Sequence, residues 1–217
     1  MIKGLIFDLD GTLIDSIEDI CFSLNLAIKE YGYEEISVDF VRKNTGKGFR
    51  KLVEDSLPQI KDSKLIDEIT DLYTIKYSEH YNDSTDAYEG MKETLTKLQE
   101  KGIKIAANSN KKDLYTKNLM KKIFPNINFV AVFGERENIP NKPDPTTANE
   151  IVELMNLSKE EVLYVGDSEV DIRTSKNANL KSIGCKWGFR GEGTLIKEGA
   201  TYIIDKPIEI LDVVERN

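Results

Sequence analysis

Short, continuous apolar runs constrain the fold of this chain more than any other feature. They span Leu5–Phe7, Ile103–Asn108, Ile127–Gly134, Glu161–Asp167, Lys181–Cys185 and Tyr202–Asp205. Several of these runs are continuously apolar rather than alternating, which is typical of parallel strands that are covered on both faces. Segments with helical spacing alternate with them, at 91–102, 111–124, 145–156 and 170–179. The sequence therefore predicts an α/β fold with a doubly wound, Rossmann-like parallel sheet, which binds ligands at the carboxyl ends of its strands.

The stretch from residue 16 to residue 86 interrupts this alternation. It carries helical patterns at 19–32, 38–46, 49–57 and 64–81 and no convincing strand. We expect an all-helical domain at 16–86 that is inserted into a catalytic core formed by 1–15 and 87–217.

Composition excludes several classes of protein. The 30 Lys and Arg against 38 Asp and Glu give a formal net charge of -8, which argues against nucleic-acid binding because that binding relies on clustered basic residues. No apolar run is long enough for a membrane helix or a signal peptide. The two cysteines are far apart, which disfavours a disulfide framework or a zinc site. We expect a cytoplasmic protein, a monomer or a homodimer, with no nucleic-acid or membrane partner.

Two aspartates follow the first apolar run directly. Asp8 and Asp10 are spaced i, i+2, so in an extended chain both carboxylates lie on one face. At a separation of ~4 Å and an effective dielectric of ~20 they would repel by about 4 kcal/mol, so the pair needs a cation, a shared proton or wide exposure to solvent. Taken alone, D-x-D-G fits a solvated turn as well as a functional site.

Further polar and charged residues follow two other predicted strands. Asp167 follows the fourth run and Asp171 comes four residues later, and hard oxygen ligands without histidine suit Mg²⁺. Ser109, Asn110 and Lys111 follow the second run at the expected mouth of a helix, a fair anion site. Each of these residues could instead have a purely structural role, since a serine before a helix is usually an N-cap.

Lys142 lies in NKPDP, after the third run, where prolines keep the chain from forming a helix. A lone lysine in such a loop is usually just solvated. The common location of all these residues at strand carboxyl ends favours one site.

These motifs together resemble the haloacid dehalogenase-like hydrolase superfamily, in the branch with a helical cap, and most closely its phosphoglycolate phosphatases. The matching segments are DLDGTLIDS, Ser109, Lys142 in KPDP, and GDSEVD. The resemblance implies that Asp8 is the nucleophile, forming an aspartyl-phosphate, and that Asp10 is the general acid and base. It also implies a Mg²⁺ site with Asp8, Asp10 (through its backbone carbonyl), Asp167 and Asp171, and phosphate binding by Ser109, Asn110 and Lys142.

The resemblance further implies a Mg²⁺-dependent phosphatase that hydrolyses a small phosphorylated metabolite, such as phosphoglycolate or a sugar phosphate. In the helical insertion, Lys47 and Arg50 are candidate specificity residues that could meet a second anionic group, although they also fit a basic helix start that faces solvent. Three alternatives stay open: a phosphosugar mutase, a pyrophosphatase, or a catalytically idle binding or regulatory member of the superfamily.

Overall fold

The computed structural model describes all residues, 1–217, and divides them into two compact units. Met1–Ile14 and Ala87–Asn217 form an α/β unit, and Asp15–Asp86 forms a helical unit. The chain passes between the two in the short strands β2 (Ile14–Asp15) and β3 (Asp86–Ala87), which pair with each other.

The α/β unit is built on a six-stranded parallel sheet in the order β5-β4-β1-β6-β7-β8. Its strands are β1 (Gly4–Phe7), β4 (Lys104–Lys112), β5 (Phe129–Glu135), β6 (Val162–Gly166), β7 (Lys181–Cys185) and β8 (Tyr202–Ile204). Strands β1 and β6 are buried along their whole length, as continuous apolar runs predict. The predicted doubly wound α/β class is confirmed.

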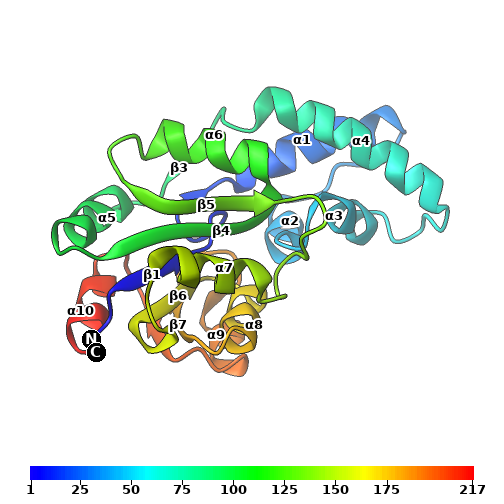
Figure 1. Cartoon of the computed structure of the whole chain (residues 1–217). Helices are drawn as coiled ribbons and strands as arrows, with labels where there is room; N and C mark the ends of the chain where they lie inside the picture. Colours follow the sequence, from blue (N-terminus) through cyan, green and yellow to red (C-terminus); the bar gives the residue numbers. More distant parts are fainter. The chain divides into compact units, whose positions relative to one another are not determined.

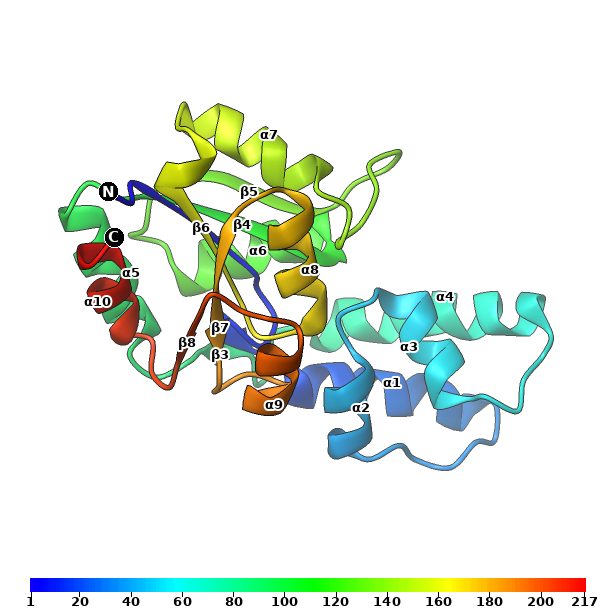
Figure 2. The same cartoon turned by 90° about the horizontal axis from the view of Figure 1, so that it is seen from below.

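Helices cover both faces of this sheet (Figure 1). They are α5 (Met91–Glu100), α6 (Asp113–Ile123), α7 (Thr146–Met155), α8 (Glu169–Asn177), α9 (Gly191–Lys197) and α10 (Glu209–Glu215), with a short 3₁₀ helix, η1 (Lys159–Glu161). Helices α5 and α6 lie on one face and α7, α8 and α9 on the other, while α10 lies beside α5 (Figure 2). The central strands of the sheet are thus shielded from solvent, whereas the edge strand β5 stays partly exposed.

The helical unit consists of α1 (Ile17–Glu30), α2 (Val38–Asn44), α3 (Phe49–Ser56) and α4 (Ser63–His80). All four lie where the helical patterns predict them. The rings of Tyr73 and Tyr77 on α4 are fully buried, and both pack against Phe49 on α3. Aromatic burial of this kind stabilises a small helical core.

None of the helices combines the length and the apolar character needed to cross a membrane. Cys21 and Cys185 are both buried and form no disulfide.

Candidate active site

Three carboxylates meet at the carboxyl edge of the sheet. Asp8 follows β1 and Asp167 follows β6, and the strand register sets them side by side because Phe7 is paired with Val165. Asp171 lies in the first turn of α8. One carboxylate oxygen from each of the three lies within 4.8 Å of the others, and all three residues are buried. Buried like charges this close need compensating positive charge or a shared proton.

Lys142 supplies part of that charge. Its Nζ donates to Oδ1 of Asp8 at 2.6 Å and to Oδ1 of Asp171 at 2.7 Å, with only 4% of the lysine side chain exposed. Burial lowers the pKa of the Lys142 ammonium, but the charges of Asp171 and Asp8 outweigh this and hold the pKa well above its usual value. The site therefore keeps a permanent positive charge beside Asp8.

One lysine does not balance three carboxylates. Burial raises the pKa of Asp8 well above its usual value, and repulsion by Asp171 and Asp167 adds to this, against the attraction of Lys142. Burial, with repulsion from Asp171, raises the pKa of Asp167 to about 7. The protein thus gathers more acidic than basic groups in a buried site.

A hard divalent cation fits this excess. The donors are carboxylate oxygens only, with no histidine or cysteine in the cluster, which is the ligand set that Mg²⁺ and Ca²⁺ accept. Asp8, Asp167 and Asp171 are therefore the residues that could hold a metal. The side chain of Asp10 lies outside this cluster.

Two groups that were not predicted as site residues bond to Asp167, and a third supports one of them. The hydroxyl of Thr12 donates to Oδ1 at 3.1 Å, and the backbone N–H of Phe189 donates to Oδ2 at 2.7 Å. The indole N–H of Trp187 in turn donates to the backbone carbonyl of Thr12 at 3.1 Å. Gly11 (φ +89°) lies so close that a Cβ there would be 2.7 Å from Oδ2 of Asp167.

Sequence reasoning missed Trp187 and Phe189. The loop that carries them follows β7, so its place at the carboxyl edge was the only available signal. Thr12 lies within the DLDGTLIDS segment, where no local pattern indicates its bond to Asp167.

A bulge in β4 carries the next group of predicted residues. Asn108 is paired with Phe133 and Lys112 with Glu135, so four steps along β4 match two along β5. Ser109, Asn110 and Lys111 stand opposite the single residue Gly134, and all three are buried. They belong to the end of the strand rather than to the mouth of a helix, because α6 begins only at Asp113. Bulges of this kind redirect side chains next to active sites.

Asn110 binds the loop that carries Lys142. The side-chain Nδ2 of Asn110 donates to the backbone carbonyl of Lys142 at 3.1 Å. The backbone N–H of Lys142 donates to Oδ1 of Asn110 at 2.8 Å. The Oγ of Ser109 accepts from the N–H of Lys111 at 3.1 Å. A direct contact of Ser109 and Asn110 with phosphate stays a prediction, whereas the role of Asn110 in positioning Lys142 follows from these bonds.

Asp10 has a different partner from Asp8. Its Oδ1 accepts from Nζ of Lys111 at 2.7 Å, and the lysine side chain is 2% exposed. Asp8 and Asp10, which are two residues apart in sequence, are therefore each paired with a different lysine.

The two specificity candidates lie in the helical unit. Lys47 is exposed. Arg50 donates to Oδ1 of Asp67 at 2.8 Å and to Oγ of Ser63 at 2.9 Å, and it also pairs with Glu54. The guanidinium of Arg50 is thus already bound by acidic neighbours, and a substrate contact by either residue stays a prediction.

Comparison with known proteins agrees with the fold. The model of the haloacid dehalogenase-like hydrolase family matches residues 5–185. A phosphoglycolate phosphatase from Aquifex aeolicus is 32% identical over 215 residues, covering 99% of this chain and 98% of its own. One from Vibrio parahaemolyticus is 30% identical, covering 98% and 96%. The crystal structure of a protein assigned as a phosphoglycolate phosphatase from Lactobacillus delbrueckii subsp. bulgaricus has a TM-score of 0.90 at 27% identity, covering 98% of each chain.

The chain belongs to the haloacid dehalogenase-like hydrolases. Within that class, the family match and these relatives together identify it as a phosphoric monoester hydrolase.

Proposed function

We propose that the protein is a Mg²⁺-dependent phosphatase that hydrolyses a small phosphomonoester through an aspartyl-phosphate on Asp8. The environment of the Asp8 carboxylate supports this most strongly. Lys142 holds Oδ1, while Oδ2 accepts no hydrogen bond from the protein and is left to attack phosphorus. A nucleophile needs this combination of a fixed position and one unhindered oxygen.

In the first step, Oδ2 of Asp8 forms a bond to phosphorus and the bond from phosphorus to the ester oxygen breaks. The leaving oxygen takes a proton from the carboxyl group of Asp10, and the alcohol departs. Lys142 and the hydroxyl of Ser109 bind the phosphoryl oxygens and offset the charge that develops on them.

In the second step, the carboxylate of Asp10 accepts a proton from water as the water oxygen bonds to phosphorus. The bond from phosphorus to Oδ2 breaks, which returns the Asp8 carboxylate and releases inorganic phosphate. Splitting one displacement into two lowers the barrier of each. Bound at Asp8, Asp167 and Asp171, Mg²⁺ would offset charge between the nucleophile and the phosphoryl group.

Phosphoglycolate is the first substrate to test, because it appears in the names of both sequence relatives. Its carboxylate is also the second anionic group that Lys47 or Arg50 in the helical unit could bind. A sugar phosphate is the second choice.

The test measures phosphate release from p-nitrophenyl phosphate and from phosphoglycolate, with Mg²⁺ and with excess chelator. We expect activity only with Mg²⁺. Asp8→Asn should reduce kcat by at least about 10³-fold, while Asp212→Asn, an exposed aspartate on α10, should leave it unchanged. Acid-quenched wild-type protein should carry one phosphoryl group on the peptide that contains Asp8.

Other outcomes would contradict the proposal in distinguishable ways. Phosphate release that persists in Asp8→Asn rules out the aspartyl-phosphate. Interconversion of hexose phosphates that depends on a bisphosphate, with little phosphate released, identifies a mutase. No turnover of any phosphomonoester identifies a binding or regulatory protein.

A further inference from the structure

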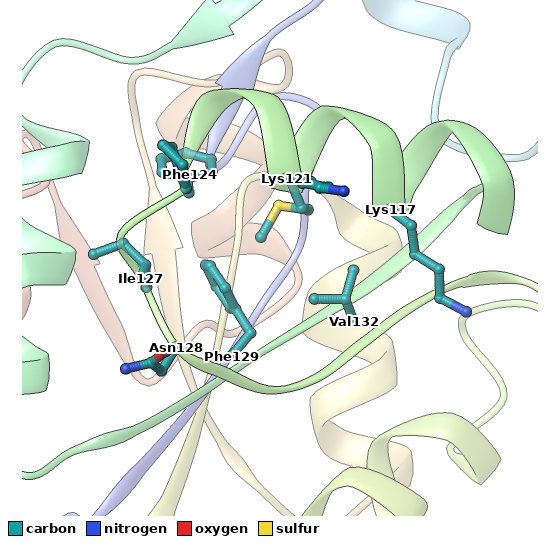
Figure 3. Close-up of a pocket in the computed structure, with 9 residues that line it drawn as sticks. Lys117, Lys121, Phe124, Ile127, Asn128, Phe129 and Val132 are labelled. Carbon is teal, nitrogen blue, oxygen red and sulfur yellow. The ribbon is translucent and has the colours of Figure 1, made fainter.

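A pocket between helix α6 and the edge strand β5 shares no residue with the acidic cluster. Its volume of about 380 Å³ is within the range of small-molecule sites. The side chains from α6 and β5 face each other across it (Figure 3). The lining residues used below are Lys117, Met120, Lys121, Phe124, Phe129 and Val132.

The floor of the pocket is apolar because of a second bulge. Phe129 is paired with Ile105 and Ala131 with Ala106, so Val130 is an extra residue in β5. The bulge puts Phe129 and Val132, three residues apart, on the same face of the strand. Both are only half-buried, so covering them would remove further apolar surface from water.

The rim of the pocket is cationic. Lys117 and Lys121, one helical turn apart on α6, both line it, and no acidic residue does. Lys117 is paired with Asp113 at 2.6 Å, whereas Lys121 takes part in no ion pair. The chain as a whole has a net charge of -8, so this unpaired ammonium is a local positive charge on an acidic protein. It would attract anionic ligands to the pocket.

We propose that this pocket binds a small amphipathic organic anion, with its apolar chain against Phe129 and Val132 and its acidic head at Lys121. Charge complementarity favours an anion over an amine or a neutral lipid, because the lining offers the unpaired ammonium of Lys121 and no carboxylate. The apolar chain supplies most of the affinity and the head supplies the selectivity.

Isothermal titration of the full chain with decanoate tests the site. We expect saturable binding of one decanoate per chain, and binding at least about tenfold weaker for decylamine, which has the same chain length and the opposite charge. Lys121→Glu should weaken the decanoate Kd roughly 3- to 10-fold. The matched control is Lys122→Glu, the next residue on the same helix, which does not line the pocket and should leave the Kd unchanged.

A second variant separates shape from charge. Val132→Trp fills the pocket from β5 without changing its charge and should abolish saturable binding, with thermal melts confirming that the variant is folded. Phosphatase activity is measured in parallel and is independent of the result, since no lining residue belongs to the acidic cluster.

Three results would overturn the proposal. They are no saturable heat with the wild type, equal weakening by Lys121→Glu and Lys122→Glu, and a dimer in sedimentation that Val132→Trp dissociates. The last result would mean that a second copy of the chain covers the pocket.

Discussion

Two buried lysines, Lys142 and Lys111, each offset the charge of different carboxylates in the site. Lys142 bonds to Asp8 and Asp171, while Lys111 bonds to Asp10. A buried ion pair fixes geometry more reliably than it adds stability, because desolvation offsets much of the attraction. We therefore interpret Lys111 as the residue that positions the carboxyl group of Asp10 for proton transfer.

Replacing Lys111 tests this interpretation. We expect Lys111→Met to lower kcat by about 10- to 100-fold, since general acid and base catalysis contributes 10²- to 10⁴-fold and depends on position. KM should change much less. Lys111→Arg should recover part of kcat, and Lys122→Met on α6 should behave as wild type. A large rise in KM with kcat unchanged would instead assign Lys111 to substrate binding.

At the scale of elements, the apolar strands and the helices with a clear period could be predicted from sequence. The strand bulges and two short helices could not. The β4 bulge at Ser109–Lys111 depends on how β4 is paired with β5, which no local pattern encodes. Helices α9 and α10, of seven residues each, were not predicted, although α2 of the same length was; in α9 two glycines weaken the helical pattern. The acidic site could be predicted because the carboxyl ends of parallel strands lie at the same edge of the sheet.

One side chain in the helical unit shows how a distant contact fixes an element. Asp19, in the first turn of α1, is 3% exposed. Its carboxylate accepts the N–H of Ser84 at 2.9 Å, the N–H of Thr85 at 2.9 Å and the hydroxyl of Thr85 at 2.6 Å. These bonds tie the start of α1 to the segment that follows α4.

Asp19→Asn should lower the free energy of unfolding by about 2 kcal/mol, because an amide keeps the shape but loses charge-assisted bonds. Urea unfolding followed by circular dichroism measures the change. Asp39→Asn is the matched control, since Asp39 also lies in the first turn of a helix but is exposed. If both variants lose the same stability, the helix dipole rather than the bonds to Ser84 and Thr85 is responsible.

At the scale of the whole molecule, surface ion pairs connect segments that are far apart in sequence. Lys3, just before β1, is 2.5 Å from Glu161, which also accepts the N–H of Ser158 at the start of η1. The bond from Lys3, followed by that from Ser158, lowers the pKa of Glu161 to about 2. The lowered pKa means that the folded state favours the ionised carboxylate.

The sign of the pH dependence follows from that direction. The stabilisation by Glu161 is fully present above its ordinary pKa of 4.5 and is lost as pH falls toward 2. Glu161→Gln should lower the Tm by about 1–3 °C at pH 7, and the difference from wild type should shrink below pH 4.5. Differential scanning calorimetry across this range measures it, with Glu160→Gln as the control. A difference that grows in acid would contradict the assignment.

The bond from the Trp187 indole to Thr12 also makes the site visible to spectroscopy. Trp187 is the only tryptophan of the chain, and Thr12 connects it to Asp167. A cation that draws Asp167 toward Asp8 should alter the polarity around the indole, so titration with Mg²⁺ should change the intrinsic fluorescence with a single saturating curve. Asp167→Asn should flatten that curve while keeping the emission of the folded state. Trp187 would then serve as an intrinsic optical probe of metal binding, which can be read without any substrate.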